Sequence, residues 1–502
     1  MTKRGLSRIL ALLGLALAVY LCIPEGDTSQ AAPAAPAPAP RPAMAAGSLA
    51  FEVLDNPLRM LGDAQAEGSN FGSESAIGDF DGDGIQDLAV GAPGSAGAAV
   101  GDRGQVFVFW GGAHGVASTS YSVLAAPDAQ AGDRYGMRLE TLPREALPRE
   151  GTHDRLLVSA TGRASSGVRA GCVFLVDVVL DLQYELTPPH AEQGMVFGAA
   201  LACGDVDLDG SHEILVSARR GSPAPGLLRA GVVWIYELED LGAPAIRLAN
   251  ADHRNHENVG NENFGNQITL AYRDGQVEGL VIGAVGNSDG DELDGGAAYL
   301  YRTPITQSSF PARSWTTPMP ELDLDGVRRF GMSLSGSRDG NGVVVGSPRH
   351  DLPMLGGANA ITAGLAIWYP DPLGGSQPEQ LLTRADGDVI ESGQYFGYMH
   401  AFGRLRSPDR EDLLLISLAA SSSSSARIFA YDTASPGTPP LQLTPPDGSS
   451  SHFAQHPEYG SLGTEAEDGL ETVVLCDPYW DPVPDGQELH VGRVLLLSSV
   501  TP

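Results

Sequence analysis

Two short runs of acidic residues have the spacing of calcium-binding loops. In the first run, carboxylates stand at positions one, three, five and nine, and the carbonyl of position seven completes the set: Asp79, Asp81, Asp83, Asp87 and Ile85. Ca²⁺ prefers roughly six to eight oxygen ligands, and Gly84 at position six permits the sharp turn that such a loop requires. The first run therefore predicts a calcium site.

The second run repeats this arrangement later in the chain. Its ligands would be Asp205, Asp207, Asp209, the carbonyl of Ser211 and Glu213, again with a glycine at position six. Glutamate at position nine is longer than the aspartate of the first run, so the geometry of the two sites should differ slightly. Two Ca²⁺ sites are expected, and the alternative for each run is an acidic turn without a metal.

Neither run completes an EF-hand. In the first run position twelve is Val90 rather than glutamate, and a strand rather than a helix is expected to follow. Asp323 and Asp325 look like a remnant of the pattern, but they stand on the wrong side of a predicted strand and are not taken as a site. An acidic cluster in the fourth unit is a weaker candidate, because its spacing does not match. For that cluster, which comprises Asn287, Asp289, Asp291 and Asp294, a solvated turn is the alternative to an additional cation site.

The elements that must position these loops form a repeat. Seven aromatic residues followed by glycine recur at intervals of 62 to 67 residues, at Phe71, Tyr135, Phe197, Phe264, Phe330, Phe396 and Tyr459. A fixed period of this size indicates a repeat architecture, and it is longer than the roughly 40 to 50 residues of a WD40 or kelch blade. We therefore expect seven units of one kind, starting near these residues.

Each unit contains apolar runs with the length of buried strands. In the first unit a run at Leu88–Pro93 follows the aromatic-glycine pair, a run led by glycine begins at Gly104, and a weaker run covers Ser122–Ala125. Together with a strand at the aromatic-glycine pair, these runs predict a blade of four strands. The expected fold is all-β, a seven-bladed β-propeller of four-stranded blades.

The two ends of the repeat region complement each other. The last unit lacks a fourth strand, whereas a strand-like segment, Phe51–Leu54, precedes the first unit without a partner. We expect the N-terminal segment to complete the last blade, because this closes the ring and leaves no long open strand edge.

Four elements of the first unit resemble the FG-GAP repeat of the integrin α-subunit head: Phe71–Gly72, the acidic run, Val90–Pro93 and the Gly104 strand. The resemblance extends over residues 48–502, although in later units only Val345–Pro348 stays close to the Gly-Ala-Pro pattern. It implies a β-propeller whose calcium loops lie in hairpins between first and second strands. It also implies a role in binding or adhesion.

The charge and the N-terminus restrict the possible partners and location. A formal charge of −31 repels nucleic acids and anionic membranes. Residues 1–31 resemble an export signal, with uncleaved anchoring or lipidation at Cys22 as alternatives, and residues 32–47 form an alanine- and proline-rich tether before the propeller at 48–502. A secreted, periplasmic or surface-attached protein is expected. The absence of Asn-x-Ser/Thr sequons fits a bacterial origin.

Neither the cysteines nor the histidines form a recognisable site. Cys172, Cys203 and Cys476 predict no disulfide framework. No catalytic motif was found, so we expect a protein that is not an enzyme; two loop clusters could still hold a transition metal or act as a general base. These clusters are His253, His256 and Glu257, and His452 with His456.

The expected function is that of an exported, calcium-binding β-propeller that binds a protein or glycan. Loops on the face opposite the calcium hairpins would form the partner surface, at residues 252–263, 287–295, 349–363 and 479–490, with Tyr479 and Trp480 as aromatic candidates. The alternatives are a carbohydrate-binding lectin and a hydrolase or lyase, either polysaccharide-degrading or akin to glycosylphosphatidylinositol-specific phospholipase D, which carries similar repeats.

Overall fold

Short strands bounded by glycine form seven antiparallel sheets of four strands in the computed structural model. The chain divides into two units, Met1–Met44 and Ala45–Pro502, and every residue described below belongs to the second. The structure describes residues 48–60, 66–95, 101–113, 115–147, 151–165, 167–222, 229–250, 262–286, 295–316, 329–353, 359–360, 363–374, 380–382, 395–405, 409, 411–417, 427–435, 440–443, 455–460, 471–479 and 492–500. The proposed export signal and tether lie outside these residues.

The first four blades each take their strands from one stretch of the chain. Blade one consists of β2 (Ser75–Gly78), β3 (Asp87–Ala92), β4 (Gln105–Phe109) and β5 (Tyr121–Leu124). Blade two consists of β6 (Tyr135–Leu142), β7 (Arg155–Ala160), β10 (Cys172–Asp177) and β11 (Leu182–Leu186). Blade three consists of β12 (Phe197–Gly204), β13 (Glu213–Ala218), β14 (Val232–Glu237) and β15 (Ile246–Ala249). Blade four consists of β16 (Phe264–Arg273), β17 (Gln276–Ala284), β18 (Ala297–Arg302) and β19 (Arg313–Thr316).

The last three blades follow the same order. Blade five consists of β20 (Ser333–Gly336), β21 (Val343–Ser347), β24 (Leu365–Tyr369) and β25 (Gln380–Leu382), and blade six of β26 (Met399–Gly403), β27 (Asp412–Ser417), β28 (Arg427–Asp432) and β29 (Leu441–Leu443). Blade seven takes β30 (Gln455–Gly460), β31 (Thr472–Asp477) and β32 (Arg493–Val500) from the end of the chain and β1 (Ser48–Asp55) from its beginning. Two small hairpins, β8 (Ala164–Ser165) with β9 (Val168–Arg169) and β22 (Leu352–Pro353) with β23 (Asn359–Ala360), a short helix α2 (Pro57–Met60) and a 3₁₀ turn (Arg144–Ala146) complete the described elements.

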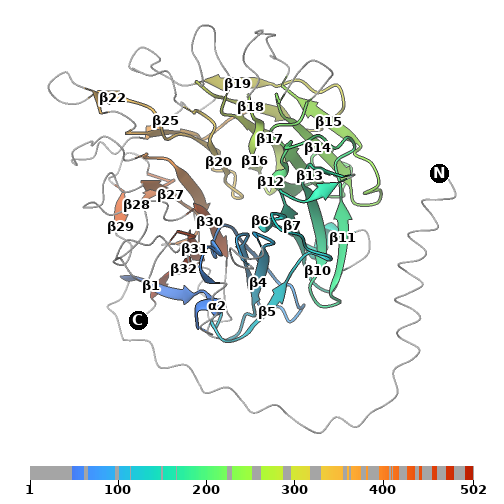
Figure 1. Ribbon diagram of the computed structural model, residues 1–502. Coiled ribbons are helices and arrows are strands. Elements are labelled where there is room, and N and C mark those ends of the chain that lie inside the picture. Colours follow the sequence, from blue (N-terminus) through green and yellow to red (C-terminus); the bar gives the residue numbers. More distant parts are fainter. Residues whose placement is uncertain are drawn as a thin grey trace, which may run out of the picture. The chain divides into compact units, whose positions relative to one another are not determined.

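The first strands of the blades contact one another around a ring: β2 with β6, then β12, β16, β20, β26, β30 and back to β2. The ring closes as predicted, because β1 pairs with β32 in an antiparallel register that places Phe51 opposite Leu497 and Leu54 opposite Val494. Figure 1 shows β1, in blue, beside β32, in dark red. Both the seven-bladed fold and the closing strand predicted from the sequence are confirmed.

The aromatic-glycine pair joins one blade to the next. Tyr135 is fully buried, its amide donates a hydrogen bond of 2.9 Å to the Arg103 carbonyl of the preceding blade, and it forms a bridge with Gly104. A Cβ atom on Gly104 would lie 2.1 Å from the Tyr135 carbonyl oxygen, so only glycine allows this approach. The same bridge joins Phe71 of blade one to Gly492 of blade seven and thus also closes the ring.

The seventh pair, Tyr459–Gly460, occupies a different place in its blade. In blade three Phe197 stands opposite Ala218, the last residue of the second strand. In blade seven Gly460 instead stands opposite Thr472, the first residue of the second strand. Tyr459 therefore lies at the hairpin end of its strand, and this unit begins earlier in the chain than the aromatic-glycine pattern indicated, because such a pair also suits the end of a strand.

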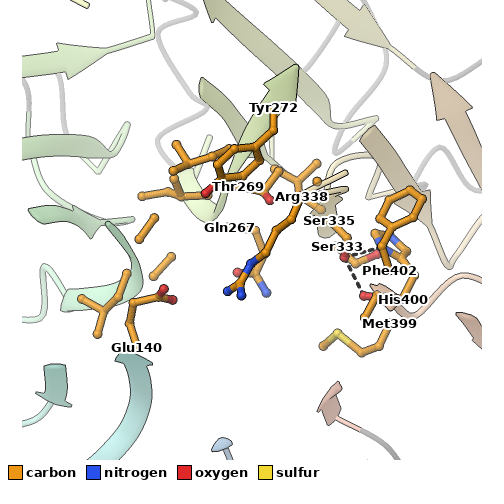
Figure 2. Close-up of a pocket in the computed structure, with 18 of the residues that line it drawn as sticks. Glu140, Gln267, Thr269, Tyr272, Ser333, Ser335, Arg338, Met399, His400 and Phe402 are labelled. Carbon is orange, nitrogen blue, oxygen red and sulfur yellow. Dashed lines mark hydrogen bonds between the residues drawn. The ribbon is translucent and has the colours of Figure 1, made fainter. Parts of the chain in front are cut away.

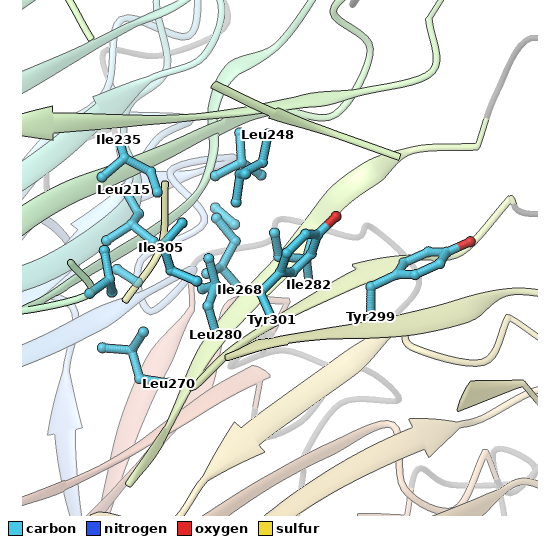
Figure 3. Packing of buried hydrophobic residues seen from close by; sticks show 14 of the residues in the cluster. Leu215, Ile235, Leu248, Ile268, Leu270, Leu280, Ile282, Tyr299, Tyr301 and Ile305 are labelled. Carbon is cyan, nitrogen blue, oxygen red and sulfur yellow. The ribbon is translucent and has the colours of Figure 1, made fainter. Parts of the chain in front are cut away.

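The hydrophobic core lies between neighbouring blades. Between blades three and four, Leu215 and Ile235 pack in one buried cluster with Leu280, Ile282 and Tyr299 (Figure 3). Another cluster joins the last blade to the first. Burial of each such side chain contributes about 1.5–3 kcal/mol before the loss of conformational entropy. The packing between blades therefore fixes where each hairpin stands on the ring.

Candidate functional site

The first acidic run forms the hairpin between β2 and β3, as expected for a loop that joins first and second strands. Its carboxylates accept hydrogen bonds from the loop backbone: Asp79 from Gly82 and Gly84 at 2.8 and 3.1 Å, and Asp81 from Asp83 at 3.0 Å. These bonds fold the loop back on itself. The side chains are thereby directed toward one point.

Three of the predicted ligands converge in this hairpin. Asp79, Asp81 and Asp87 offer oxygens that lie within 4.8 Å of one another, whereas Asp83 does not belong to the group and accepts a hydrogen bond from the Ile85 amide at 2.7 Å. Burial raises the pKa of the Asp87 carboxyl to about 7, against the hydrogen bonds from the Gly111 and Phe80 amides, which lower it.

An arginine of the next blade already neutralises part of the negative charge of this cluster. Arg144 lies in the turn between β6 and β7, and its Nη1 stands 3.0 Å from Asp79 Oδ2. Asp154 holds the two loops together, because it accepts hydrogen bonds from the Asp79 and Arg144 amides at 2.8 and 2.9 Å. Part of the negative charge of the first hairpin is thus neutralised within the protein.

The second acidic run forms the equivalent hairpin between β12 and β13 of blade three. Asp205, Asp207 and Glu213 bring their oxygens within 4.8 Å of one another. Glu213 Oε2 accepts a hydrogen bond from the Val206 amide at 2.8 Å, and Asp209 accepts one from the Ser211 amide at 2.8 Å. Ile85 and Ser211, the two residues predicted to offer a carbonyl ligand, lie in these loops. Their amides donate the hydrogen bonds to Asp83 and Asp209 given above.

Two buried oxygens of the blade-three hairpin have no hydrogen-bond partner among the described residues. They are Asp205 Oδ1 and Glu213 Oε1. Burial raises the pKa of Glu213 to about 8 and also raises the pKa of Asp207. A buried carboxylate oxygen without a partner is costly, so the blade-three hairpin fits a hard divalent cation that would accept both lone oxygens.

Glu237 extends the blade-three cluster and was not predicted from the sequence. It forms a second group with Asp207 and Asp209, again with oxygens within 4.8 Å of one another. The strand register explains its position, because Glu237 at the end of β14 stands directly opposite Glu213. Counting along the third strand from Gly231 could have found it. Blade one has a tryptophan in place of this glutamate: Leu88 stands opposite Phe109, so the next residue, Trp110, takes the position that Glu237 has in blade three.

Comparison with known proteins supports the assignment of the repeat. Residues 71–109, which contain the first hairpin and β3 and β4, match the family model of the FG-GAP repeat. This protein is a β-propeller that carries an FG-GAP repeat. Among solved structures, the FG-GAP propeller is similar to the crystal structure of Sqt1 from Saccharomyces cerevisiae, at 9% identity over 86% of this chain and 97% of that chain, with a TM-score of 0.47. No curated protein sequence matches it.

Several other predicted sites of the FG-GAP propeller lie outside the described residues. These are the cluster at 287–294, Asp323 and Asp325, His253, His256 and Glu257, His452, and Trp480. His456 lies in β30, and Tyr479 follows β31. Within the part that the structure describes, no helix has the length and apolar character needed to cross a membrane. Cys172, Cys203 and Cys476 are not paired in disulfides.

The first strands of the FG-GAP propeller line a central cavity of about 390 Å³, a size that suits small ligands. The third residue after the aromatic of each of the first six units lines it: Glu74, Arg138, Ala200, Gln267, Ser333 and Met399. Arg338 reaches toward Gln267 and Glu140 across the cavity (Figure 2). Directly after β26, Arg404 pairs with Asp339 and, at 3.9 Å, with Glu471, and all three residues line the cavity. This cavity is not apparent from the sequence, because its lining comes from strands more than 60 residues apart.

One serine-histidine pair borders the cavity. Ser335 Oγ donates a hydrogen bond of 2.5 Å to the His400 carbonyl and lies 2.9 Å from His400 Nδ1 (Figure 2). Since the serine proton points to the carbonyl, Nδ1 must donate to Oγ, which places the imidazole lone pair on Nε2. Burial lowers the pKa of His400 to about 3. The imidazole is therefore not oriented to take a proton from Ser335.

Proposed function

We propose that this protein is an exported, calcium-binding β-propeller that acts as a binding module for a protein or glycan. The observation that carries the proposal is the blade-three hairpin, where Asp205 Oδ1 and Glu213 Oε1 are buried without a hydrogen-bond partner among the described residues. The FG-GAP repeat and the propeller fold are consistent with a binding module.

The proposed metal has a structural role. Asp205, Asp207 and Glu213 would hold one ion in blade three, and Asp79, Asp81 and Asp87 a second in blade one. Bound Ca²⁺ would neutralise the carboxylates and fix each hairpin, and a ligand that binds only the folded protein raises its stability by mass action. The side chains themselves are held in place by the loop amides described above.

The partner surface is proposed on the face opposite the acidic hairpins. Connections from second to third strands leave the sheets at that end, and in blades two and five they are long enough to contain the small hairpins β8–β9 and β22–β23. Loops carried on a rigid scaffold are a frequent position for binding residues. Export is proposed from the N-terminal sequence and from the family of the first repeat.

A role without catalysis is proposed on the geometry of the cavity. Ser335 directs its proton to a backbone carbonyl, and the buried His400 stays neutral. Activation of a serine needs a base that accepts its proton. The hydrolase alternative therefore lacks support from this pair.

The test combines calcium binding with partner capture. Calorimetry on the metal-free full chain should show uptake of Ca²⁺, and immobilised protein should capture its partner from the native envelope more strongly with calcium than with chelator. Asp207→Ala is the site variant, and Asp432→Ala on β28 is the matched acidic control. Absence of calcium uptake, or capture that is equal with and without chelator in the wild type, would overturn the proposal.

A further inference from the structure

Five arginines lie near the ends of their strands on the side opposite the acidic hairpins, although the chain as a whole carries a charge of −31. We call the group Arg138, Arg219, Arg220, Arg329 and Arg349 the arginine mouth. Each lies at the end of the strands opposite the acidic hairpins: Arg138 near the start of β6, Arg219 and Arg220 directly after β13, Arg329 before Phe330, and Arg349 after β21. The mouth therefore lies on the face proposed above to bind a partner.

Arg219 is a half-buried member of the arginine mouth, whereas its neighbour Arg220 is exposed. Arg219 occupies the position that Pro93 occupies in blade one, and its Nη1 donates a long hydrogen bond of 3.4 Å to Asn266 Oδ1. Its buried Nε has no acceptor among the described residues. Burial first, and then the positive charges of Arg138 and Arg220, lower the pKa of Arg219 to about 10. The fold thus holds a partly desolvated cation beside two others.

Arg138 lies across the small side chains at the start of β12. Its Nε donates a hydrogen bond of 3.1 Å to the Ala199 carbonyl, and its Nη1 lies 3.5 Å from Glu74 Oε2. Glu74 offsets one positive charge of the mouth. Arg219, Arg220 and Arg349 form no ion pair with any described residue.

Two further members of the mouth, Arg329 and Arg349, belong to blade five and act on Tyr398 of blade six. Burial raises the pKa of Tyr398, whereas the positive charges of Arg138, Arg329 and Arg349 lower it. The guanidinium groups of blades two and five therefore act on one phenol of blade six. The positive charge of the mouth thus comes from three blades, two, three and five, and is not confined to one loop.

We propose that the arginine mouth binds a doubly charged oxyanion, a sulfate or phosphate group. Guanidinium groups bind tetrahedral oxyanions through paired hydrogen bonds, and a dianion would offset more of the like-charge repulsion than a single carboxylate. Arg219 Nε, lacking an acceptor, would gain one. The oxyanion would be bound either as the free ion or as an ester on a sugar. Recognition of a sugar ester rests on the function proposed above, whereas the oxyanion site itself does not.

Calorimetry in chelator, at low ionic strength and with chloride held constant, tests the site without calcium. Sodium sulfate and sodium phosphate should bind saturably with one site per chain. Arg219→Gln should weaken binding at least about tenfold, as should Arg138→Gln, because each removes a charged donor. Arg219→Lys should retain part of the affinity, and Arg313→Gln on β19 is the matched control. Binding that does not saturate, or that is equal in Arg219→Gln and Arg313→Gln, would overturn the proposal.

The melting temperature, measured with and without sulfate, is a second readout. It separates an oxyanion site from a purely structural role of Arg219, which would not make the melting temperature depend on sulfate. Without oxyanion, Arg219→Gln should melt at the same or a higher temperature than the wild type, since it removes like-charge repulsion; sulfate should raise the melting temperature of the wild type alone. An Arg219→Gln protein that sulfate stabilises as much as the wild type contradicts the site. If sulfate binds but partner capture fails, only the proposed function is overturned.

Calorimetry with galactose 6-sulfate and glucose 6-phosphate tests whether the oxyanion is recognised as an ester on a sugar. Tighter binding of these esters than of the free ions would support recognition of a substituted sugar. Equal binding would support a site for the free anion. In either case the affinity should depend on Arg219, and independence from Arg219 would contradict the assignment of the mouth.

Discussion

The hairpins of blades one and three share a ligand pattern but differ in how their charge is compensated. In blade one Arg144 stands 3.0 Å from Asp79, and both oxygens of Asp87 accept hydrogen bonds from backbone amides. In blade three Asp205 Oδ1 and Glu213 Oε1 have no described partner, and Glu237 adds a further carboxylate. The run that matches the calcium pattern better in sequence therefore has the weaker requirement for a cation. Spacing alone does not rank metal sites.

The largest expected difference is in the stabilisation by calcium. At a concentration about 100 times the dissociation constant, one bound ion raises the free energy of unfolding by about 2.7 kcal/mol. Asp207→Ala should abolish most of the calcium-dependent stabilisation seen in denaturant titrations, whereas Asp81→Ala should leave the larger part. An equal or greater loss in Asp81→Ala would reverse the ranking of the two hairpins.

The pH dependence of the metal-free protein is the next largest effect. Folding raises the pKa of Glu213 to about 8 and of Asp87 to about 7, above the values of about 4 for unfolded chains. The folded state thus binds protons more strongly, so stability should fall as pH rises from about 4 to 8. Denaturant titrations in chelator should show this loss, and Glu213→Gln should remove the part that extends to pH 8. A loss that persists in Glu213→Gln would assign it to other groups.

Removal of the compensating arginine should bring the first hairpin closer to the third. Arg144→Gln frees Asp79 of its cation, so calcium affinity at blade one should rise severalfold while the metal-free protein becomes slightly less stable. Arg163→Gln, at the other end of blade two, is the control. Calorimetry that shows unchanged calcium affinity in Arg144→Gln would mean that the arginine does not compete with the metal.

The smallest effect is expected for the additional carboxylate of blade three. Glu237→Gln should weaken calcium binding there by a small factor and leave blade one unchanged, because Glu237 joins the group through Asp207 and Asp209 rather than through the buried oxygens. Competition titrations with a calcium indicator can resolve this change in a protein whose first site is disabled by Asp81→Ala. A complete loss of the blade-three site would make Glu237 a principal ligand.

The sequence by itself determined the repeat, the strands, the closing role of Phe51–Leu54 and the place of the two acidic loops in the blades. Apart from the closing strand, these features are local: the carboxylates of a loop lie within nine residues of one another, and alternation of glycine with apolar runs fixes a strand where it stands. Even here the local pattern misplaced the start of the seventh unit, because an aromatic-glycine pair fits both ends of a strand.

Only the tertiary structure decided which carboxylates are compensated. Arg144 is 65 residues from Asp79, and Glu237 reaches its site through the register of β14 against β13. The cavity and the arginine mouth likewise combine residues of several blades, one repeat or more apart. Spacing in the chain cannot rank such pairs, because the packing of neighbouring blades sets both the distances and the burial on which the charge balance depends.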